Sequence, residues 1–573
     1  MFSFNELRKI SKQQINGQEI RIAILGNCST QLFAKAIDGN CKAENINSLV
    51  FDADYNQIDF QLLNKDSEVY SFNPKVLILW ISTEKLYEDF LILNADEKAS
   101  FAENYIEKIK NYWNLIKEHS DAKIIQFNFT EIDDKALGNY SIKVEQSFIY
   151  QIRKLNYLLS ESMKRESNVF PVDLLSIQVK LGTSFFFNPV LYYSSKMSVS
   201  IDALPYISEQ VVKVIKSLIG RIAKCLIMDL DNTIWGGIIG DDGLDNIEIG
   251  ELGTGRLFTN FQKWIKQLKE FGIILAVCSK NNEEIAKEPF KKHKDMILRL
   301  SDISLFVANW DDKATNIRMI QESLNIGMDS IVFIDDNRFE RNLVKQVIPD
   351  ILVPDLPDDP ADYLSFLQSC NLFETSSFEG VVLDRTAQYQ AQFERKKLEM
   401  SFSSIDDYLS SLEMECVAEP FQKSQLPRIS QLAQRSNQFN LRTIRYSEED
   451  VRRIANDNNY LTFSCTLKDK YGDYGLVSVV IIKKINHEIG FVETWLMSCR
   501  ALKRGLEEFT VNKMIELCKK NGLKVLNSEY IPTPKNAMVK NIYLDFGFES
   551  IGDNLFSIKI DKYVTKKNYI KEV

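Results

Sequence analysis

The chain has 573 residues, of which 45% are hydrophobic and 26% charged. This composition is typical of a folded globular protein, and at roughly 150 residues per domain the length predicts several domains. The net charge of −9 and the pI of about 5.3 argue against a nucleic-acid partner, which would require clustered positive charge.

Hydropathy and cysteine usage predict a cytoplasmic protein. Residues 1–14 mix charged and scattered apolar residues, so we expect no signal peptide. The longest apolar runs, such as Val76–Ile81, have the length of a strand and predict no membrane insertion. Nine cysteines without a Cys-x-x-Cys pair indicate reduced thiols, not a disulfide framework or a zinc site.

The first part of the chain, residues 1–220, alternates apolar strand patterns with amphipathic helix patterns. Strands are predicted at 21–25, 76–81 and 123–127, and a helix at 104–119. Such alternation predicts a parallel sheet with helices on both faces, an α/β sandwich.

The same alternation continues over residues 221–370. The predicted strands are 225–228, 273–278, 305–307 and 330–334, and the predicted helices are 257–271, 313–324 and 338–347. A second parallel sheet with a Rossmann-like layer order follows from this pattern.

The remaining sequence predicts a connector and a third domain. The Pro- and Asp-rich residues 354–360 end the second pattern. Helices are expected at 363–372 and 384–400, the latter within a helical connector at 371–414, and at 434–440. From residue 415 to 573 the sequence is rich in strand patterns, with strands predicted at 477–482 and 491–497 and a helix at 507–521. This pattern predicts an α+β domain.

Two carboxylates, Asp229 and Asp231, directly follow the strand at 225–228. Carboxylates so close together repel each other unless a cation lies between them, and Mg²⁺ prefers such oxygen ligands. An EF-hand loop is excluded because Thr233 and Ile234 stand where that loop needs an acidic or amide residue and a glycine. A chance acidic turn stays open on this motif alone.

Three further polar positions follow the other predicted strands of the same sheet. Ser279 ends the second strand, Lys313 begins the helix after the third, and Asp335 and Asp336 end the fourth. Because the carboxyl ends of parallel strands meet at one edge, we expect these groups to gather there with the first two carboxylates. Phosphoryl transfer needs this combination of positioning and charge neutralisation, and it needs no histidine.

This ordered set resembles the four motifs of the haloacid dehalogenase (HAD) superfamily. The resemblance implies that Asp229 is the nucleophile that becomes an aspartyl-phosphate, and that Asp231 protonates the leaving group and later activates water. It also implies that Ser279, Lys313 and Thr233 bind the phosphoryl group.

The same resemblance implies the magnesium ligands. Asp229, Asp335 and the backbone carbonyl of Asp231 would bind Mg²⁺, and Asp336 would support the site. Residues 235–237 and 241–243 are expected to form turns of a short flap. The spacing to Ser279 leaves room for no large cap, so a bulky or protein-borne substrate could reach the metal.

Longer strings are similar to one branch of that superfamily. The segments CLIMDLDNTIWGGIIGDDG at 225–243, CSKNN at 278–282, NWDDK at 309–313 and FIDDNRFER at 333–341 resemble the FkbH-like family, HAD phosphatase subfamily IIIC. The resemblance implies a phosphohydrolase or phosphotransferase acting on a phosphorylated metabolite. The alternative is a protein that loads a phosphoglycerate-derived acyl unit onto an acyl carrier protein, with Cys278 as the candidate thiol.

Both flanking domains resemble enzyme families, but each carries only part of the family's motif. Residues 26–29, Gly-Asn-Cys-Ser, resemble the nucleophile turn of an SGNH or flavodoxin-like sandwich. Asp173 could supply the acid, but no histidine lies near it in the sequence, so we expect a non-catalytic scaffold or docking domain.

The C-terminal domain resembles GNAT-type acyltransferases over residues 495–507 and 543–548. The corresponding pyrophosphate loop would comprise Arg500, Lys503, Arg504 and Gly505, with Lys503 replacing a glycine. The resemblance implies binding of acetyl-CoA or of a phosphopantetheine arm. A GNAT acetyltransferase with a regulatory HAD domain is therefore a third, weaker alternative.

Overall fold

The computed structural model describes residues 2–132, 134–377, 402 and 404–573. The predicted helix at 384–400, and with it much of the connector, lies outside this part of the chain. The chain divides into two compact units, Met1–Lys216 and Ser217–Val573. The domain boundaries expected at residues 220, 370 and 414 stay predictions. Among the described helices, none combines the length and the apolar character needed to cross a bilayer.

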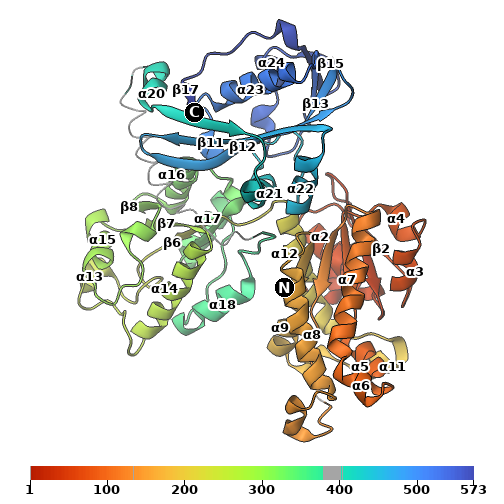
Figure 1. The fold of residues 1–573 in the computed structure, drawn as a ribbon. Coiled ribbons are helices and arrows are strands. Elements are labelled where there is room, and N and C mark those ends of the chain that lie inside the picture. The colour runs from red at the N-terminus through yellow and green to blue at the C-terminus, as the bar shows by residue number, and fades with distance from the viewer. Residues whose placement is uncertain (1, 133, 378–401, 403) are drawn as a thin grey trace. The chain divides into compact units, whose positions relative to one another are not determined.

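The first unit contains a five-stranded parallel sheet with the order β2-β1-β3-β4-β5 (Figure 1). Its strands are β1 (Ile20–Gly26), β2 (Ser48–Asp52), β3 (Val76–Trp80), β4 (Lys123–Phe127) and β5 (Val169–Val172). Its helices are α1 (Phe4–Ile10), α2 (Gln31–Ala43), α3 (Ile58–Leu63), α4 (Glu68–Phe72), α5 (Thr83–Leu91), α6 (Ala95–Ala99), α7 (Phe101–His119), α8 (Phe148–Met163), α9 (Leu174–Leu181), α10 (Thr183–Phe186), α11 (Pro189–Ser195) and α12 (Leu204–Leu218).

Strand residues of this sheet point alternately to two helical layers. On one face, Leu77 and Ile124 pack in the same cluster as Trp113 of α7 and Leu155 of α8. On the other face, the ring of Trp80 meets that of Phe33 in α2 edge-on, with ring centroids 4.4 Å apart. A parallel sheet covered on both faces explains the uninterrupted apolar runs of the central strands.

The second unit begins with a four-stranded parallel sheet of order β8-β7-β6-β9. The strands are β6 (Cys225–Met228), β7 (Ile274–Ser279), β8 (Leu305–Ala308) and β9 (Ile331–Ile334). The helices are α13 (Ile239–Asp242), α14 (Gly255–Glu270), α15 (Glu283–Lys292), α16 (Lys313–Leu324), α17 (Arg338–Val347) and α18 (Tyr363–Cys370).

The two faces of this sheet pack against different helices. Leu226 and Val277 lie in a cluster with Phe261 of α14, whereas Ile227 and Ala276 lie in a cluster with α16 and α17. Alternate residues of each strand therefore support opposite layers, as in a Rossmann-like sheet. The prediction of this layer order is confirmed.

The rest of the second unit forms an eight-stranded, mostly antiparallel sheet of order β15-β16-β14-β13-β12-β11-β10-β17. Its strands are β10 (Met414–Glu419), β11 (Tyr460–Asp469), β12 (Gly472–Lys484), β13 (Ile489–Met497), β14 (Val525–Glu529), β15 (Glu549–Gly552), β16 (Leu555–Lys559) and β17 (Ile570–Glu572). The accompanying helices are α20 (Ile405–Ser411), α21 (Leu426–Arg435), α22 (Glu448–Asn456), α23 (Leu506–Lys520) and α24 (Ile542–Asp545).

This sheet has the predicted α+β character, but one predicted helix is misplaced. The helix expected at 434–440 is wrong, because α21 begins at Leu426 and ends at Arg435. Residues 439–441 instead run beside β13, where Leu441 N–H donates to the Trp495 carbonyl and Met497 N–H to the Phe439 carbonyl. Proline at the second helical position favours the earlier start.

Candidate active site

The polar residues predicted to converge lie at the carboxyl edge of the four-stranded sheet. β6 and β9 are neighbours with Met228 opposite Ile334, so the next residues, Asp229 and Asp335, emerge side by side. Ser279 is the last residue of β7, and Lys313 is the first residue of α16 after β8. Strand order and register alone thus bring the four segments together.

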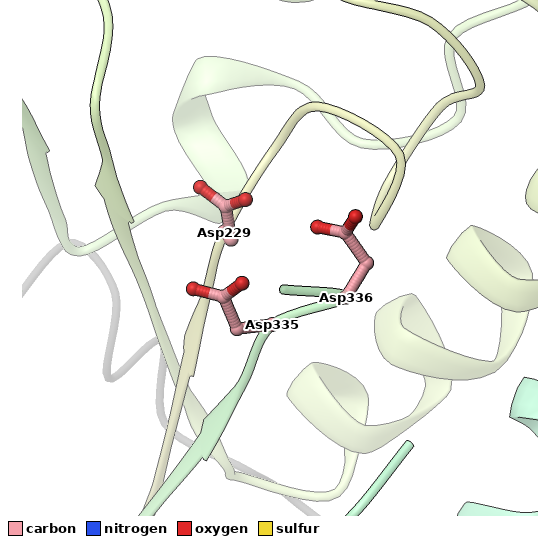
Figure 2. Close-up of side chains that lie close together, drawn as sticks. All are labelled: Asp229, Asp335 and Asp336. Atoms are coloured by element: carbon pink, nitrogen blue, oxygen red, sulfur yellow. The ribbon is translucent and has the colours of Figure 1, made fainter. Parts of the chain in front are cut away.

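Three carboxylates form a compact cluster at this edge (Figure 2). Asp229, Asp335 and Asp336 each offer one oxygen, and these oxygens all lie within 4.8 Å of one another. Asp229 and Asp335 are buried, and Asp336 is partly exposed. Hard, closely spaced carboxylate oxygens fit the coordination preferences of Mg²⁺.

Lys313 supplies the positive charge within this cluster. Its Nζ lies 2.9 Å from Asp229 Oδ1 and 2.5 Å from Asp335 Oδ2, and its side chain is almost fully buried. Burial alone would lower the pKa of Lys313, but the two carboxylates outweigh it and raise that pKa. The lysine therefore stays charged, and one ammonium faces three carboxylates.

Burial and the excess negative charge raise the pKa of the neighbouring carboxyl groups. Burial, together with the charge of Asp229, raises the pKa of Asp335 to about 7. The same two causes raise the pKa of Asp336. The Asp336 carboxylate is held by the Thr233 hydroxyl at 3.3 Å, and Asp336 N–H donates to the same hydroxyl at 3.1 Å.

The carboxylate of Asp231 is not part of the three-carboxylate cluster. It accepts hydrogen bonds of 3.0 Å from the Trp235 indole, the Ile239 backbone N–H and the Asn281 amide. Burial raises the pKa of Asp231, and the hydrogen bonds from the Ile239 N–H and the Trp235 indole oppose this shift. Its metal contact through the backbone carbonyl stays a prediction.

The turn that follows Asp231 depends on the conformation of Asn232. Asn232 has a φ of +53°, a left-handed conformation that asparagine tolerates better than most residues. Its side-chain oxygen accepts the Gly237 N–H at 2.9 Å and closes the loop. The loop thereby holds the chain in the turn that follows Asp231.

The flap after β6 is short, as the turn residues at 235–237 and 241–243 predicted. Gly236 and Glu248 exchange two backbone hydrogen bonds, and only the four-residue α13 lies between them. Gly237 has a φ of +91°, which requires glycine. Trp235 was expected to be a turn residue, but its ring is fully buried and its N–H binds Asp231.

Arg341 is a functional candidate that the sequence did not single out. Its guanidinium is buried and donates to the backbone carbonyls of Asp335 at 2.8 Å and Asp336 at 2.6 Å. It also donates to the Leu356 carbonyl at 3.3 Å. Arg341 thus fixes the backbone that presents two of the three clustered carboxylates, a role that only the fold reveals.

Cys278 and the α23 loop are less open to ligands than the sequence suggested. The Cys278 thiol is buried against the Lys313 carbonyl, and burial raises its pKa. Lys503 N–H donates to the Glu507 carboxylate at 2.9 Å. The Arg504 guanidinium lies 5.4 Å from the centre of the Tyr474 ring.

The remaining residues of the predicted pyrophosphate loop lie at the start of α23. Gly505 is the N-cap with a φ of +79°, and Arg500 lies in the short 3₁₀ turn before it. Because Glu507 already binds an amide of this loop, an incoming pyrophosphate would have to displace a carboxylate. Coenzyme binding by these residues stays a prediction.

Ser29, in the turn after β1, is hydrogen-bonded to backbone carbonyls of the same unit. The Ser29 hydroxyl donates to the Ser195 carbonyl, and Ser29 N–H donates to the Lys196 carbonyl. Asp173 caps α9 and accepts from the Asn128 amide at 2.7 Å. Both groups are engaged in structural contacts, in keeping with a scaffold.

Comparisons with known proteins found one matching family model and several similar solved structures. Residues 21–216 match the family model for the FkbH N-terminal domain. A crystal structure of the N-terminal part of protein BF1531 from Bacteroides fragilis, which contains a phosphatase domain complexed with Mg, is 45% identical. The match covers 66% of this chain and 100% of that chain, with a TM-score of 0.63. No curated protein matches the sequence.

Two acetyltransferases match a quarter of the chain. The Escherichia coli ribosomal-protein-S18-alanine N-acetyltransferase is 15% identical, with 25% of this chain and 94% of that chain covered and a TM-score of 0.20. The Vibrio cholerae spermidine N-acetyltransferase in complex with CoA and spermine is 15% identical, with 26% and 98% covered and a TM-score of 0.21. These low scores support no conclusion about the C-terminal part.

The BF1531 match is complete over that protein's solved part, and the family model covers the first unit. The charged motifs on which the family resemblance depends all lie at one sheet edge. The chain belongs to the FkbH-like family of the HAD superfamily.

Proposed function

We propose that the chain is a Mg²⁺-dependent phosphohydrolase or phosphotransferase that acts on a phosphorylated metabolite. The cluster of Asp229, Asp335 and Asp336 around a single ammonium carries this proposal, because it holds more negative charge than Lys313 neutralises. The Mg complex of the BF1531 phosphatase domain supports the same ion.

The proposed reaction has two steps. A carboxylate oxygen of Asp229 attacks phosphorus, the bond from phosphorus to the leaving oxygen breaks, and Asp231 gives that oxygen a proton. Water then attacks the aspartyl-phosphate, Asp231 takes a proton from it, and phosphate leaves. The raised pKa of Asp231 supports the first of its two roles.

Other side chains would hold the phosphoryl group in line. Lys313 and the Ser279 hydroxyl would bind its oxygens, whereas Thr233 contributes through its contact with Asp336. Asp229, Asp335 and Asp336 would hold Mg²⁺, which neutralises charge on the phosphoryl oxygens when bound. Arg341 would act only through the backbone of Asp335 and Asp336.

Phosphate release from a panel of phosphorylated metabolites tests the proposal. We expect release by the native chain only with Mg²⁺, and a loss of roughly 10⁶-fold in Asp229→Asn, as for other covalent nucleophiles. Asp350→Asn, which removes an exposed carboxylate after α17, is the matched control. Equal release by all three proteins, or release unaffected by chelation, would refute the proposal.

Acyl loading of a carrier protein is a second proposal, which the family resemblance implies. The short flap favours it because a protein-borne acceptor could approach the site. Burial of Cys278 disfavours a mechanism through that thiol. A mass increase of an acyl carrier protein incubated with the chain and a phosphorylated three-carbon acid would support it.

Acetyl transfer is the weakest of the three proposals. The contact of Glu507 with the Lys503 amide places a carboxylate where a coenzyme phosphate is expected. Calorimetric titration of acetyl-CoA into the full chain would measure coenzyme binding directly. Absence of binding heat would exclude an acetyltransferase function. Cytoplasmic location and the absence of a nucleic-acid partner stay predictions from composition.

A further inference from the structure

Asn281 lies in the loop between β7 and α15 and is almost fully buried, with 5% of its surface exposed. Its amide Nδ2 donates to Asp231 Oδ2 at 3.0 Å. The sequence predicted chemical roles for Asp231 and for Ser279, two residues before Asn281, but none for Asn281 itself. Because β6 and β7 are neighbours in the sheet, this contact joins the loop of one strand to a carboxylate in the loop of the next.

The hydrogen-bond donors to Asp231 are divided unequally between its two oxygens. Oδ1 accepts from the Trp235 indole and from the Ile239 backbone N–H, each at 3.0 Å. Among the described residues, Oδ2 accepts from Asn281 alone. Each carboxylate oxygen has two lone-pair positions, so Oδ1 is saturated and Oδ2 keeps one open position. Proton exchange with a substrate oxygen needs such a position, which assigns the exchange to Oδ2.

The orientation of the Asn281 amide follows from its second hydrogen bond. Its Oδ1 accepts the Asn282 backbone N–H at 2.9 Å. A backbone N–H can only donate, so the amide oxygen must face it and the NH₂ group must face Asp231. Asn282 is fixed in turn, because its side chain accepts the N–H groups of Glu284 and Ile285 and caps α15. The loop and the helix together hold the amide donor in place.

A purely structural role for Asn281 is the simpler alternative. Its bond to Asp231 would then only tie the flap after β6 to the loop after β7. The flap, however, is already closed by the two backbone hydrogen bonds between Gly236 and Glu248. The Asn281 donor also reaches the one carboxylate oxygen of Asp231 to which no described residue of the flap donates. Both observations favour an effect on the carboxyl group itself.

We propose that Asn281 is a positioning residue that orients Asp231 Oδ2 for proton transfer to the leaving oxygen of the substrate. The inference rests on the proposed phosphotransferase function. As the bond from phosphorus to the leaving oxygen breaks, its electron pair stays on that oxygen, the proton of Oδ2 moves to it, and Asp231 becomes a carboxylate. Asn281 donates to one lone pair of Oδ2 and thereby fixes the rotation of the carboxyl group. It acts only through Asp231.

The need for this proton depends on the leaving group, which provides the test. An alkyl phosphate leaves as a strongly basic alkoxide unless its oxygen is protonated, whereas 4-nitrophenyl phosphate leaves as a stable phenolate. The first probe is the alkyl phosphate that the native chain hydrolyses fastest, and the second is 4-nitrophenyl phosphate. The quantity compared is kcat/KM, because it reports the steps up to loss of the leaving group and not the later hydrolysis of the aspartyl-phosphate.

The proposal predicts unequal losses in Asn281→Ala. We expect kcat/KM for the alkyl phosphate to fall by about 10- to 100-fold, a part of the 10²- to 10⁴-fold that a proton donor contributes. The value for 4-nitrophenyl phosphate should stay within about twofold of the native one, since that leaving group needs no proton. Misfolded protein would lower both values by the same factor, so their ratio does not depend on the folded fraction.

Gln267→Ala, which removes an exposed amide of α14, is the control and should leave both values unchanged. Equal losses on the two substrates in Asn281→Ala would overturn the proposal and leave a structural role. Native activity on 4-nitrophenyl phosphate but on no alkyl phosphate would also overturn it, because no proton donor would then be at work. Absence of Mg²⁺-dependent release from both substrates would instead refute the proposed function.

A double variant tests whether Asn281 acts through Asp231. In an Asp231→Asn background, Asn281→Ala should cause no further fall in kcat/KM for the alkyl phosphate, because no acid is left to orient. Independent contributions would multiply instead. A further loss of about tenfold in the double variant would show that Asn281 acts on the substrate directly, and it would contradict the positioning role.

Discussion

The two parallel sheets of the chain have similar architecture but treat the polar groups at their carboxyl edges differently. In the first unit these groups bind one another: Thr30 donates to Asp52 at 2.6 Å and Thr130 to Thr83 at 2.8 Å. At the edge of β6 and β9, three carboxylates share a single lysine.

We expect this difference to distinguish a scaffold from a catalytic site. Self-satisfied polar groups stabilise a loop and leave little binding capacity for a ligand. At the first edge, burial raises the pKa of the buried Glu84 carboxyl group in α5 to about 7. An uncompensated cluster such as that of Asp229, Asp335 and Asp336 is instead a candidate for catalysis.

Replacing Lys313 should affect this balance most. In Lys313→Met we expect kcat to fall by about 10² to 10³, the loss typical of removing one electrostatic stabiliser. Mg²⁺ should bind at least as tightly as in the native chain, because Lys313 competes for oxygens of Asp229 and Asp335. Steady-state kinetics and Mg²⁺ titration measure the two effects separately.

Lys291→Met, on the exposed side of α15, is the control and should leave both quantities unchanged. A parallel loss of Mg²⁺ affinity and kcat in Lys313→Met would mean that the lysine holds the carboxylates in place. The cluster would then resemble the self-satisfied edge of the first unit, and the contrast between the two sheets would fail.

Much of the second unit could be predicted because local and long-range signals agree there. The strand Cys225–Met228 and the helices Lys313–Leu324 and Arg338–Val347 have the predicted bounds. The side chains of Asp312 and Asn337 cap these two helices, which fixes where each begins. Parallel strand order then dictated which residues would meet.

What the sequence could not predict depends on side-chain direction and on distant partners. Trp235 was expected at a turn, yet its indole reaches inward to Asp231. Glu507 was expected simply to begin a helix, yet it closes back on Lys503. Neither contact leaves a periodic signal, because each is set by local loop geometry.

Replacing Arg341 should have a smaller effect on the carboxylate cluster at the end of β9. In Arg341→Lys we expect Mg²⁺ affinity to fall by about 10- to 100-fold, as for other groups that orient ligands. A lysine cannot donate at once to the carbonyls of Asp335, Asp336 and Leu356 in the planar geometry of a guanidinium. Activity should recover at high Mg²⁺.

The matched control is Arg338→Lys, an exposed position at the start of the same helix. Recovery of kcat at saturating Mg²⁺, in a variant that unfolds without Mg²⁺ at the same temperature as the control, distinguishes a positioning role from loss of folding. Failure to recover would show that Arg341 acts on more than the ligand backbone.

The smallest effect should come from a substitution at the carboxyl edge of the sheet in the first unit. Ser29→Ala removes the hydrogen bond to the Ser195 carbonyl and should lower the free energy of unfolding by about 1 kcal/mol, with phosphate release unchanged. Ser194→Ala, which removes an exposed hydroxyl bonded to the Val190 carbonyl in α11, is the control. Urea unfolding and an ester-hydrolysis assay measure the outcome. Ester hydrolysis by the native chain that disappears in Ser29→Ala would make this edge catalytic, because a hydroxyl engaged only in structure has no reaction to lose.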